Sequence, residues 1–390
     1  MSVPAARPDS RRAEGSRPPD GARPDGSRPD GSRPDGARDG GSRRASYPGF
    51  NATLKLVGTG PRGSRDLSFD ESREALRALL AAEATPAQAG AFLIATRIKG
   101  ESPEELAGYA QALRDVARPL TADTRRPLVA CAGAYDGSVE APHLSLAAAV
   151  LAAACGAGVV VHCGPRLGPK YGVTARDVLA ELGGPGSPTL EESEAMLSRA
   201  GVTLVDTARA VAGWDALLTL RNEVGLRGPV HSAEKLLDYF GARRFVVGYT
   251  HSAYAGRLLG ALHRLGAERA ITVRGIEGSD VVRPGRPVAH ELAGAKESTG
   301  ESGPCAAIEL PEQLGQAVSA PGGERASAEL TTAILAGAHH GPELSAVLLG
   351  AAIRLYAAGL ARDARDAFDV ADAAIKDGNA RATLAAMVGR

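Results

Sequence analysis

The 390-residue sequence lacks any apolar run of the ~18 residues that a membrane-spanning helix needs, so no such helix is expected. It has only four cysteines, which show no metal-ligand spacing and fit reduced, buried thiols in the cytoplasm. Its 45 basic and 45 acidic residues cancel, so the overall charge does not require a polyanionic partner. These absences favour a cytoplasmic protein that does not act at a membrane.

Residues 1–50 are expected to form a disordered tail. Before Leu54 the chain contains no aliphatic side chain larger than valine, so this stretch cannot bury enough apolar surface to offset the entropy of ordering. It also lacks the apolar centre of a secretion signal. The repeated Arg-Pro-Asp-Gly sequence gives the tail a positive charge, which either favours contact with nucleic acid or only keeps the tail soluble. The repeat places arginines at Arg23, Arg28, Arg33 and Arg38.

Residues 51–121 carry the signals of a helical domain. Ser68, Thr85 and Ser102 are each followed three positions later by Glu or Gln, which is the capping-box pattern at the start of a helix. Proline follows both Thr85 and Ser102, at the first helical position. Apolar residues then recur at helical spacing, so we expect three successive helices.

Residues 122–390 alternate short apolar runs with helical segments. Such alternation predicts right-handed crossovers and a mostly parallel sheet. We therefore expect the α/β class, with a small all-helical N-terminal domain beside a large α/β domain, and with part of 174–200 packed on the helical domain. The expected strands are 128–132, 158–162, 202–205, 244–248 and 270–274.

Two loops leave the carboxyl ends of expected strands, where ligands bind in sheets of this kind. Loop 132–138 contains glycines, which suits a phosphate because free backbone N–H groups face the anion. An ordinary strand-to-helix turn has the same composition. Loop 163–172 carries Arg166 and Lys170, which either clamp a phosphate or are simply solvated.

Further along the chain, acidic and basic side chains are candidates for a metal or an anionic substrate. The loop after the last expected strand contains Glu277 and Asp280, which either offer oxygen ligands to Mg²⁺ or are ordinary turn residues. Arg221 and Arg227 either fix an anionic substrate or pair with Glu223. Neither pattern decides between its two interpretations.

Taken in order along the chain, these segments resemble the anthranilate phosphoribosyltransferase-like family (glycosyltransferase family 3) from about Ser68 to the C-terminus. Segment 92–101 looks like the signature of the family's helical domain, and 379–384 looks like its terminal helix. The resemblance implies the nucleoside phosphorylase/phosphoribosyltransferase fold and a homodimer formed through the helical domain. It also implies a site for phosphoribosyl pyrophosphate, with Mg²⁺ as a possible cofactor.

The resemblance also implies roles for individual residues. It assigns contact with the acceptor's carboxylate to Arg221 and metal binding to Asp280 and Ser145. The residues that it assigns to phosphate binding are Gly133, Asp136, Gly137, Ser145, His162 and Lys170. Two positions depart from the family pattern. Tyr135 stands where the family has glycine, and Val281 stands where it has a second metal carboxylate. Because losing one preorganised group of this kind costs ~10²–10³ in rate, classical anthranilate activity is doubtful.

This altered set is similar to the divergent second branch of the family, at least some members of which are regarded as nucleic-acid binders. Three hypotheses follow: a phosphoribosyl (pentosyl) transferase, a glycosyltransferase with another acceptor, and a non-catalytic paralogue that binds single-stranded nucleic acid in the same cleft. No aromatic stripe for base stacking is evident, so such binding would be independent of sequence. The cations expected to line that groove are Arg97, Lys99, Arg166, Lys170, Arg176, Arg227 and Lys235.

Overall fold

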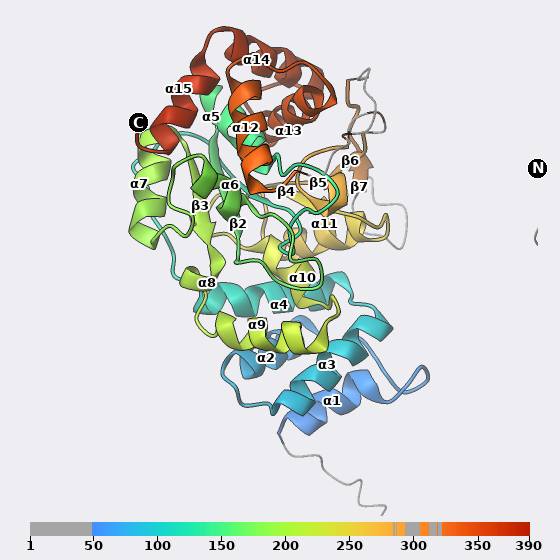
Figure 1. The fold of residues 1–390 in the computed structure, drawn as a ribbon. Helices are drawn as coiled ribbons and strands as arrows, with labels where there is room; N and C mark the ends of the chain where they lie inside the picture. Colours follow the sequence, from blue (N-terminus) through green and yellow to red (C-terminus); the bar gives the residue numbers. More distant parts are fainter. Residues whose placement is uncertain (1–48, 284, 286, 293–304, 312–317, 319–321) are drawn as a thin grey trace, which may run out of the picture. The chain divides into compact units, whose positions relative to one another are not determined.

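The computed structural model describes residues 49–283, 285, 287–292, 305–311, 318 and 322–390 (Figure 1). The predicted tail lies outside these residues, except for the two at its end. Across the described ranges, no helix combines the length and the apolar character needed to cross a membrane.

The helical domain begins with α1 (Phe50–Gly58), α2 (Phe69–Leu80), α3 (Pro86–Lys99) and α4 (Pro103–Val116). The three predicted capping boxes, at Ser68, Thr85 and Ser102, are all present. In each, the cap side chain accepts a backbone N–H, and the residue three positions later accepts the N–H of the cap, so both donors are satisfied.

A helix from the middle of the chain completes this domain. It is α9 (Trp214–Val224), which contacts α2 and α3 and buries Trp214 and Leu217 (Figure 1). The sequence predicted this contact for part of 174–200. In the structure, α7 (Leu190–Ala200) packs mainly on β3 and α15. It also contacts the end of the predicted helical domain, where Glu191 pairs with Arg118 and Glu194 accepts the backbone N–H of Thr121.

The larger domain is built on a sheet with the strand order β3-β2-β1-β4-β5-β6-β7. Neighbours among β1–β5 pair in parallel, whereas β6 and β7 pair antiparallel at one edge. The structure confirms the predicted fold class, a helical domain beside an α/β domain with a mostly parallel sheet. The strands are β1 (Leu128–Ala132), β2 (Gly158–Cys163), β3 (Val202–Asp206), β4 (Arg244–Tyr249), β5 (Arg269–Arg274), β6 (Ala289–Leu292) and β7 (Cys305–Ala307).

Helix α5 (Ser145–Ala154) is the centre of the core on one side of the sheet. Nine of its ten residues are buried, because its sequence is almost entirely alanine, leucine and valine. It packs against β2, α13 (Pro342–Ala358) and α15 (Asn379–Met387) (Figure 1). The remaining helices are α6 (Ala175–Glu181), α8 (Thr207–Ala210), α10 (Val230–Ala233), α11 (Tyr254–Arg264), α12 (Glu324–Leu335) and α14 (Ala364–Lys376).

Candidate active site

The loops that follow β1, β2 and β5 meet backbone to backbone at the carboxyl ends of these strands. A Cβ added at Gly133 would lie 2.8 Å from the Cα of Ser279 in the β5 loop. A Cβ at Gly137 would lie 2.4 Å from the backbone oxygen of Gly172 in the β2 loop, and Gly137 also has a positive φ of 76°. Only glycine permits these approaches. The sequence predicted the three loops separately, and the structure brings them together.

Asp136 is buried at the centre of this junction and has two cationic partners. Arg227 donates to Oδ2 from Nε at 2.9 Å and from Nη2 at 2.5 Å. Lys170 places Nζ 3.8 Å from Oδ1. The Arg227 side chain is 37% exposed, whereas that of Asp136 is 1% exposed. A molecule arriving from solvent therefore meets the cations before the carboxylate.

Glu277 holds the β1 loop from the other side. Its carboxylate accepts the backbone N–H groups of Val139, Glu140 and Ala141 at 3.1, 2.8 and 3.1 Å, and Lys170 Nζ lies 3.1 Å away. Burial opposes ionisation of Glu277, but these donors outweigh it and hold its pKa below the ordinary value. Because its oxygens are occupied in this way, Glu277 is not placed to supply the metal carboxylate that Val281 lacks.

Tyr135 points into the protein interior beneath the same loop. Its hydroxyl oxygen lies 2.5 Å from Nδ1 of His162, 2.9 Å from Oγ1 of Thr207 and 3.2 Å from the backbone oxygen of Glu234. Burial lowers the pKa of His162 to about 3, so this imidazole is neutral. Its Nε2 is buried without a hydrogen-bond partner among the described residues. Tyr135 thus fixes His162, a predicted phosphate ligand, within the core.

Asp280 also has both carboxylate oxygens occupied. Ser145 donates its hydroxyl to Oδ1, and Arg354 of α13 donates from Nη2 to Oδ2 at 2.6 Å. Asp280 and Arg354 are 1% and 0% exposed, and Val281 beside them is buried. Arg354 was not predicted from the sequence. The available signal was a single arginine in the buried, mostly apolar part of α13, where an unpaired charge is not tolerated.

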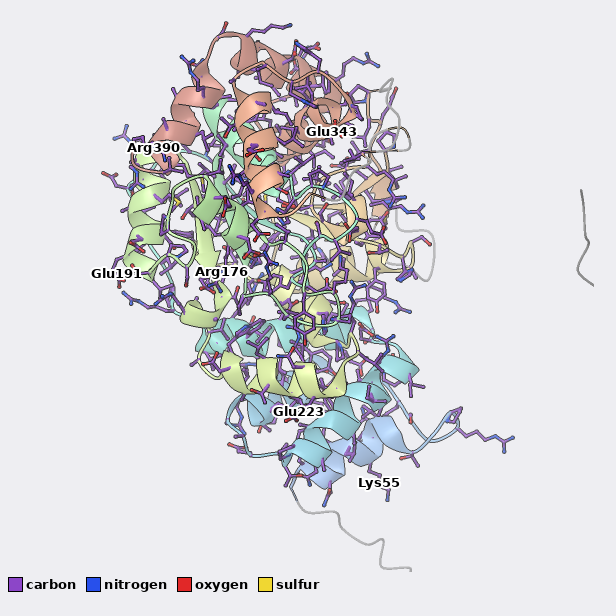
Figure 2. The ribbon with its side chains drawn as sticks, in the orientation of Figure 1. Lys55, Arg176, Glu191, Glu223, Glu343 and Arg390 are labelled. Carbon is purple, nitrogen blue, oxygen red and sulfur yellow. The ribbon has the colours of Figure 1, made fainter. Side chains whose placement is uncertain are left out.

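The predicted acceptor ligand, Arg221, is buried and paired. It forms a bidentate pair with Glu234 through Nη1–Oε2 and through Nη2–Oε1 at 3.2 Å, and its guanidinium lies 5.7 Å from the centre of the Trp214 ring. Burial raises the pKa of Glu234 to about 6, although the nearby Arg221 opposes this shift. Neither Arg221 nor Arg227 pairs with Glu223, which Figure 2 shows on α9.

Two cavities adjoin Tyr135. The smaller, about 20 Å³, is lined by His143, His162, Ser145 and Asp280. The larger, about 320 Å³, opens between the helical domain and the ends of β1 and β4. Its charged side chains are three cations and two carboxylates, and its tyrosines supply flat apolar surface. These lining residues are Arg97, Arg227, Lys235, Glu101, Asp136, Tyr135, Tyr249 and Tyr254.

The other cations predicted for a nucleic-acid groove have local partners. Lys99 pairs with Glu105, 2.7 Å away, and Arg166 pairs with Asp177 and with Glu324 of α12. Arg176, which Figure 2 labels, lies on α6 with its Nη1 3.1 Å from Asp206. Lys235 lines the larger cavity and donates to the backbone oxygen of Gly248 at 2.8 Å, and burial lowers its pKa to about 8.

Comparison with known proteins assigns this arrangement to a family. Residues 53–117 match the helical bundle domain of a glycosyl transferase family, and residues 136–381 match the α/β domain of a glycosyl transferase family. The chain is 31% identical over 319 residues to the anthranilate phosphoribosyltransferase of Haloquadratum walsbyi, covering 82% of this chain and 92% of that protein. It belongs to this family of transferases. The family resemblance inferred from the sequence is therefore confirmed.

Further relatives support the same family assignment. Anthranilate phosphoribosyltransferase 2 of Streptomyces coelicolor is 32% identical over 327 residues, which cover 82% of this chain and 94% of that protein. The crystal structure of the Thermus thermophilus anthranilate phosphoribosyltransferase superposes with a TM-score of 0.72 at 28% identity, covering 87% of this chain and 98% of that one. The Saccharomyces cerevisiae enzyme in complex with PRPP and Mg shares the fold, with a TM-score of 0.69 at 18% identity and coverage of 87% and 96%.

The residues of this family member do not fit a magnesium ion at Asp280. Both oxygens of Asp280 already accept hydrogen bonds, one of them from a guanidinium, and the next residue is valine. Within the described parts of the chain, no group of three or more His, Cys, Asp or Glu side chains is arranged to hold a metal ion. Mg²⁺ prefers an octahedral set of oxygen ligands, which this position does not offer. The assignment of Asp280 and Ser145 to a metal remains a prediction from the resemblance.

Proposed function

We propose that the protein binds a phosphorylated ribose, such as phosphoribosyl pyrophosphate, in the larger cavity and transfers the pentosyl group. The observation that carries this proposal is the convergence of Arg97, Arg227 and Lys235 on one cavity at the carboxyl ends of β1 and β4. Its volume of about 320 Å³ suits a small ligand. Arginine forks and a lysine are the groups that recognise phosphate in proteins.

The acceptor in this proposal is not held by Arg221. That guanidinium is 2% exposed and is already neutralised by the fully buried carboxylate of Glu234. Freeing it for a substrate carboxylate would leave Glu234 buried without its partner, which is strongly unfavourable. The proposal is therefore a pentosyl transferase whose acceptor differs from anthranilate, although the relatives named above carry the name of anthranilate enzymes.

A second candidate function is sequence-independent binding of single-stranded nucleic acid in the same cavity. The observation in its favour is that Tyr249 and Tyr254 line the cavity together with the cations, since aromatic faces stack on bases. Against it, Lys99, Arg166 and Arg176 are paired with carboxylates outside the cavity. Fewer cations are thus available to follow a phosphate backbone than the sequence suggested.

Calorimetric titration of the full chain separates the two candidates. Phosphoribosyl pyrophosphate is expected to bind saturably, and Arg227→Met is expected to weaken binding by about tenfold or more, because a charge-assisted contact contributes ~1.5–3 kcal/mol. Arg362→Met is the matched control, since Arg362 is an exposed arginine that pairs with Asp366, away from the cavity. Failure to bind the sugar diphosphate, together with binding of single-stranded DNA that weakens steeply with salt, would replace the first function with the second.

We also propose that the protein forms a homodimer through its helical domain. Val57, Ile94, Ile98, Val224 and Leu226 line an apolar groove formed by α1, α3 and the end of α9. Ile98 and Leu226 are 80% and 50% exposed, which is costly for a monomer.

A cytoplasmic location stays a prediction from the sequence.

Light scattering after gel filtration tests the homodimer. Ile98→Asp is expected to convert a dimer into a monomer, because it places a charge in the apolar groove. Leu360→Asp, at another exposed leucine, is expected to leave the mass unchanged. A wild-type protein that elutes as a monomer at micromolar concentration would contradict the proposal.

A further inference from the structure

The loop after β5 holds a buried carboxylate that is neutralised from within the protein. Asp280 accepts one hydrogen bond from Ser145, at the start of α5, and one from Arg354, on α13. The three residues come from three separate elements, and each is at most 3% exposed. No ligand is needed to satisfy the Asp280 carboxylate.

The Arg354 guanidinium is fixed by more than this carboxylate. Nη1 donates to the backbone oxygen of Gly350 at 2.7 Å and lies 3.4 Å from the backbone oxygen of Asp280. A Cβ at Gly350 would come 2.9 Å from the Cβ of Ala148 on α5 and 3.3 Å from Nη1. The glycine thus allows α13 to pack closely on α5 at the level of the guanidinium.

Arg354 balances the single negative charge that remains at this position. Where the resemblance predicts two adjacent carboxylates, this chain has Asp280 and the neutral Val281, so one negative charge is missing. Arg354 supplies a single positive charge to the one carboxylate that is left, and a divalent ion would leave an excess of positive charge in the interior. The cavity beside Asp280 measures about 20 Å³, which is room for about one water and not for a hydrated ion.

We propose that the Arg354 guanidinium is a built-in cation that takes the place of a divalent metal at Asp280. This chain therefore holds its phosphorylated ligand without a metal ion there, and Arg97, Arg227 and Lys235 neutralise the phosphate charge. The statement about the metal stands on the geometry of Asp280 alone, whereas the statement about the ligand rests on the function proposed above.

Uptake of Mn²⁺ by the full chain, followed by the electron paramagnetic resonance signal of the free ion, tests the metal statement. The wild type is expected to take up no more Mn²⁺ than Asp280→Asn. Uptake of about one ion per chain that Asp280→Asn abolishes would overturn the inference. This comparison needs no variant of Arg354, so it stands even where such a variant fails to fold.

Variants of Arg354 test whether the guanidinium occupies the position of a cation. Arg354→Glu removes the cation and supplies a second carboxylate beside Asp280, so it is expected to gain Mn²⁺ uptake that disappears in the double variant Arg354→Glu/Asp280→Asn. Arg354→Lys keeps the charge and is expected to show no uptake. A folded Arg354→Glu protein that takes up no Mn²⁺ would contradict the inference.

Titration with phosphoribosyl pyrophosphate, in EDTA and in Mg²⁺, separates this inference from the proposed function. Dissociation constants that agree within about threefold support both. Tightening by more than about tenfold in Mg²⁺, lost in Asp280→Asn, overturns the inference and leaves the proposed function standing. Failure to bind in either buffer contradicts the proposed function and the ligand statement, while the Mn²⁺ comparison decides the metal statement.

Discussion

Asp136 and Asp280 lie in loops that touch each other, and each is 1% exposed, yet they are neutralised in different ways. The partners of Asp136 are Arg227 and Lys170, whose side chains are 37% and 18% exposed. The partner of Asp280 is Arg354, which solvent does not reach. One carboxylate therefore lies behind cations that a ligand can contact, and the other lies in a closed ion pair.

This difference separates a binding role from a structural role within one site. A ligand phosphate that approaches Arg227 can share its donors, because the guanidinium already faces the larger cavity. A ligand that approached Asp280 would first have to displace a buried guanidinium, which would leave a buried charge unpaired. The four predictions below test this comparison from its largest expected effect to its smallest.

Breaking the closed pair is expected to have the largest effect. Arg354→Met leaves Asp280 buried without its cation, and the free energy of unfolding is expected to fall by ~3–5 kcal/mol. Arg362→Met is the control, since the Arg362–Asp366 pair is exposed and contributes only ~0–1 kcal/mol. Urea denaturation measures both variants. Equal, small losses would show that Asp280 does not depend on Arg354.

Replacing Tyr135, the residue before Asp136, is expected to have the next largest effect on stability. Tyr135→Phe removes a hydroxyl that lies within 3.2 Å of three buried polar atoms, and the stability loss is expected to be ~1–3 kcal/mol. Tyr171→Phe is the control, because the hydroxyl of the exposed Tyr171 donates to the Asn222 side chain at the surface and its loss should cost less than ~0.5 kcal/mol. Thermal unfolding followed by circular dichroism compares the two. A Tyr135→Phe protein as stable as the control would contradict an interior role for this hydroxyl.

Acid is expected to lower the stability of the protein through the buried His162. Burial lowers the pKa of His162 to about 3, from an ordinary value of about 6.5 in the unfolded chain. The unfolded state therefore binds more protons between these values, and stability falls as the pH decreases through this range, by about 2 kcal/mol at pH 5. Urea denaturation at pH 7, 6 and 5 measures the fall.

The acid prediction has a matched pair of variants. His162→Gln is expected to flatten the dependence of stability on pH, because glutamine does not titrate. His263→Gln, at an exposed histidine on α11, is expected to leave it unchanged. An identical fall in the wild type and in His162→Gln would assign the acid sensitivity to other groups.

Breaking the partly exposed pair of Arg227 and Asp136 is expected to have the smallest effect on stability. Arg227→Met leaves Asp136 with Lys170, and because Arg227 is partly exposed the loss should be about 1 kcal/mol. The same substitution should have its main effect on ligand binding, as described above. A loss as large as that of Arg354→Met would remove the distinction between the two aspartates.

Much of the fold could be predicted from local sequence signals. The capping boxes at Ser68, Thr85 and Ser102 are contained in four residues each, and the five parallel strands are apolar runs. The antiparallel strands β6 and β7 were not foreseen, because they are short and β6 mixes Ala, His, Glu and Leu.

The candidate site was only partly predictable. The sequence indicated the loops after β1, β2 and β5, because ligands bind at the carboxyl ends of parallel strands. It did not indicate partners, since Arg354 is 74 residues from Asp280 and Arg227 is 91 residues from Asp136. Such pairs depend on how α13 and the segment after α9 pack, which no local pattern encodes. Tyr135 was noticed as a departure, but its partner Thr207 was not.

A crystal structure of the full chain with phosphoribosyl pyrophosphate and Mg²⁺ tests the central claim most directly. The account predicts the ligand's phosphates at Arg97, Arg227 and Lys235 in the larger cavity, with Arg354 still paired to Asp280. A magnesium ion on Asp280, with the Arg354 side chain displaced, would contradict it.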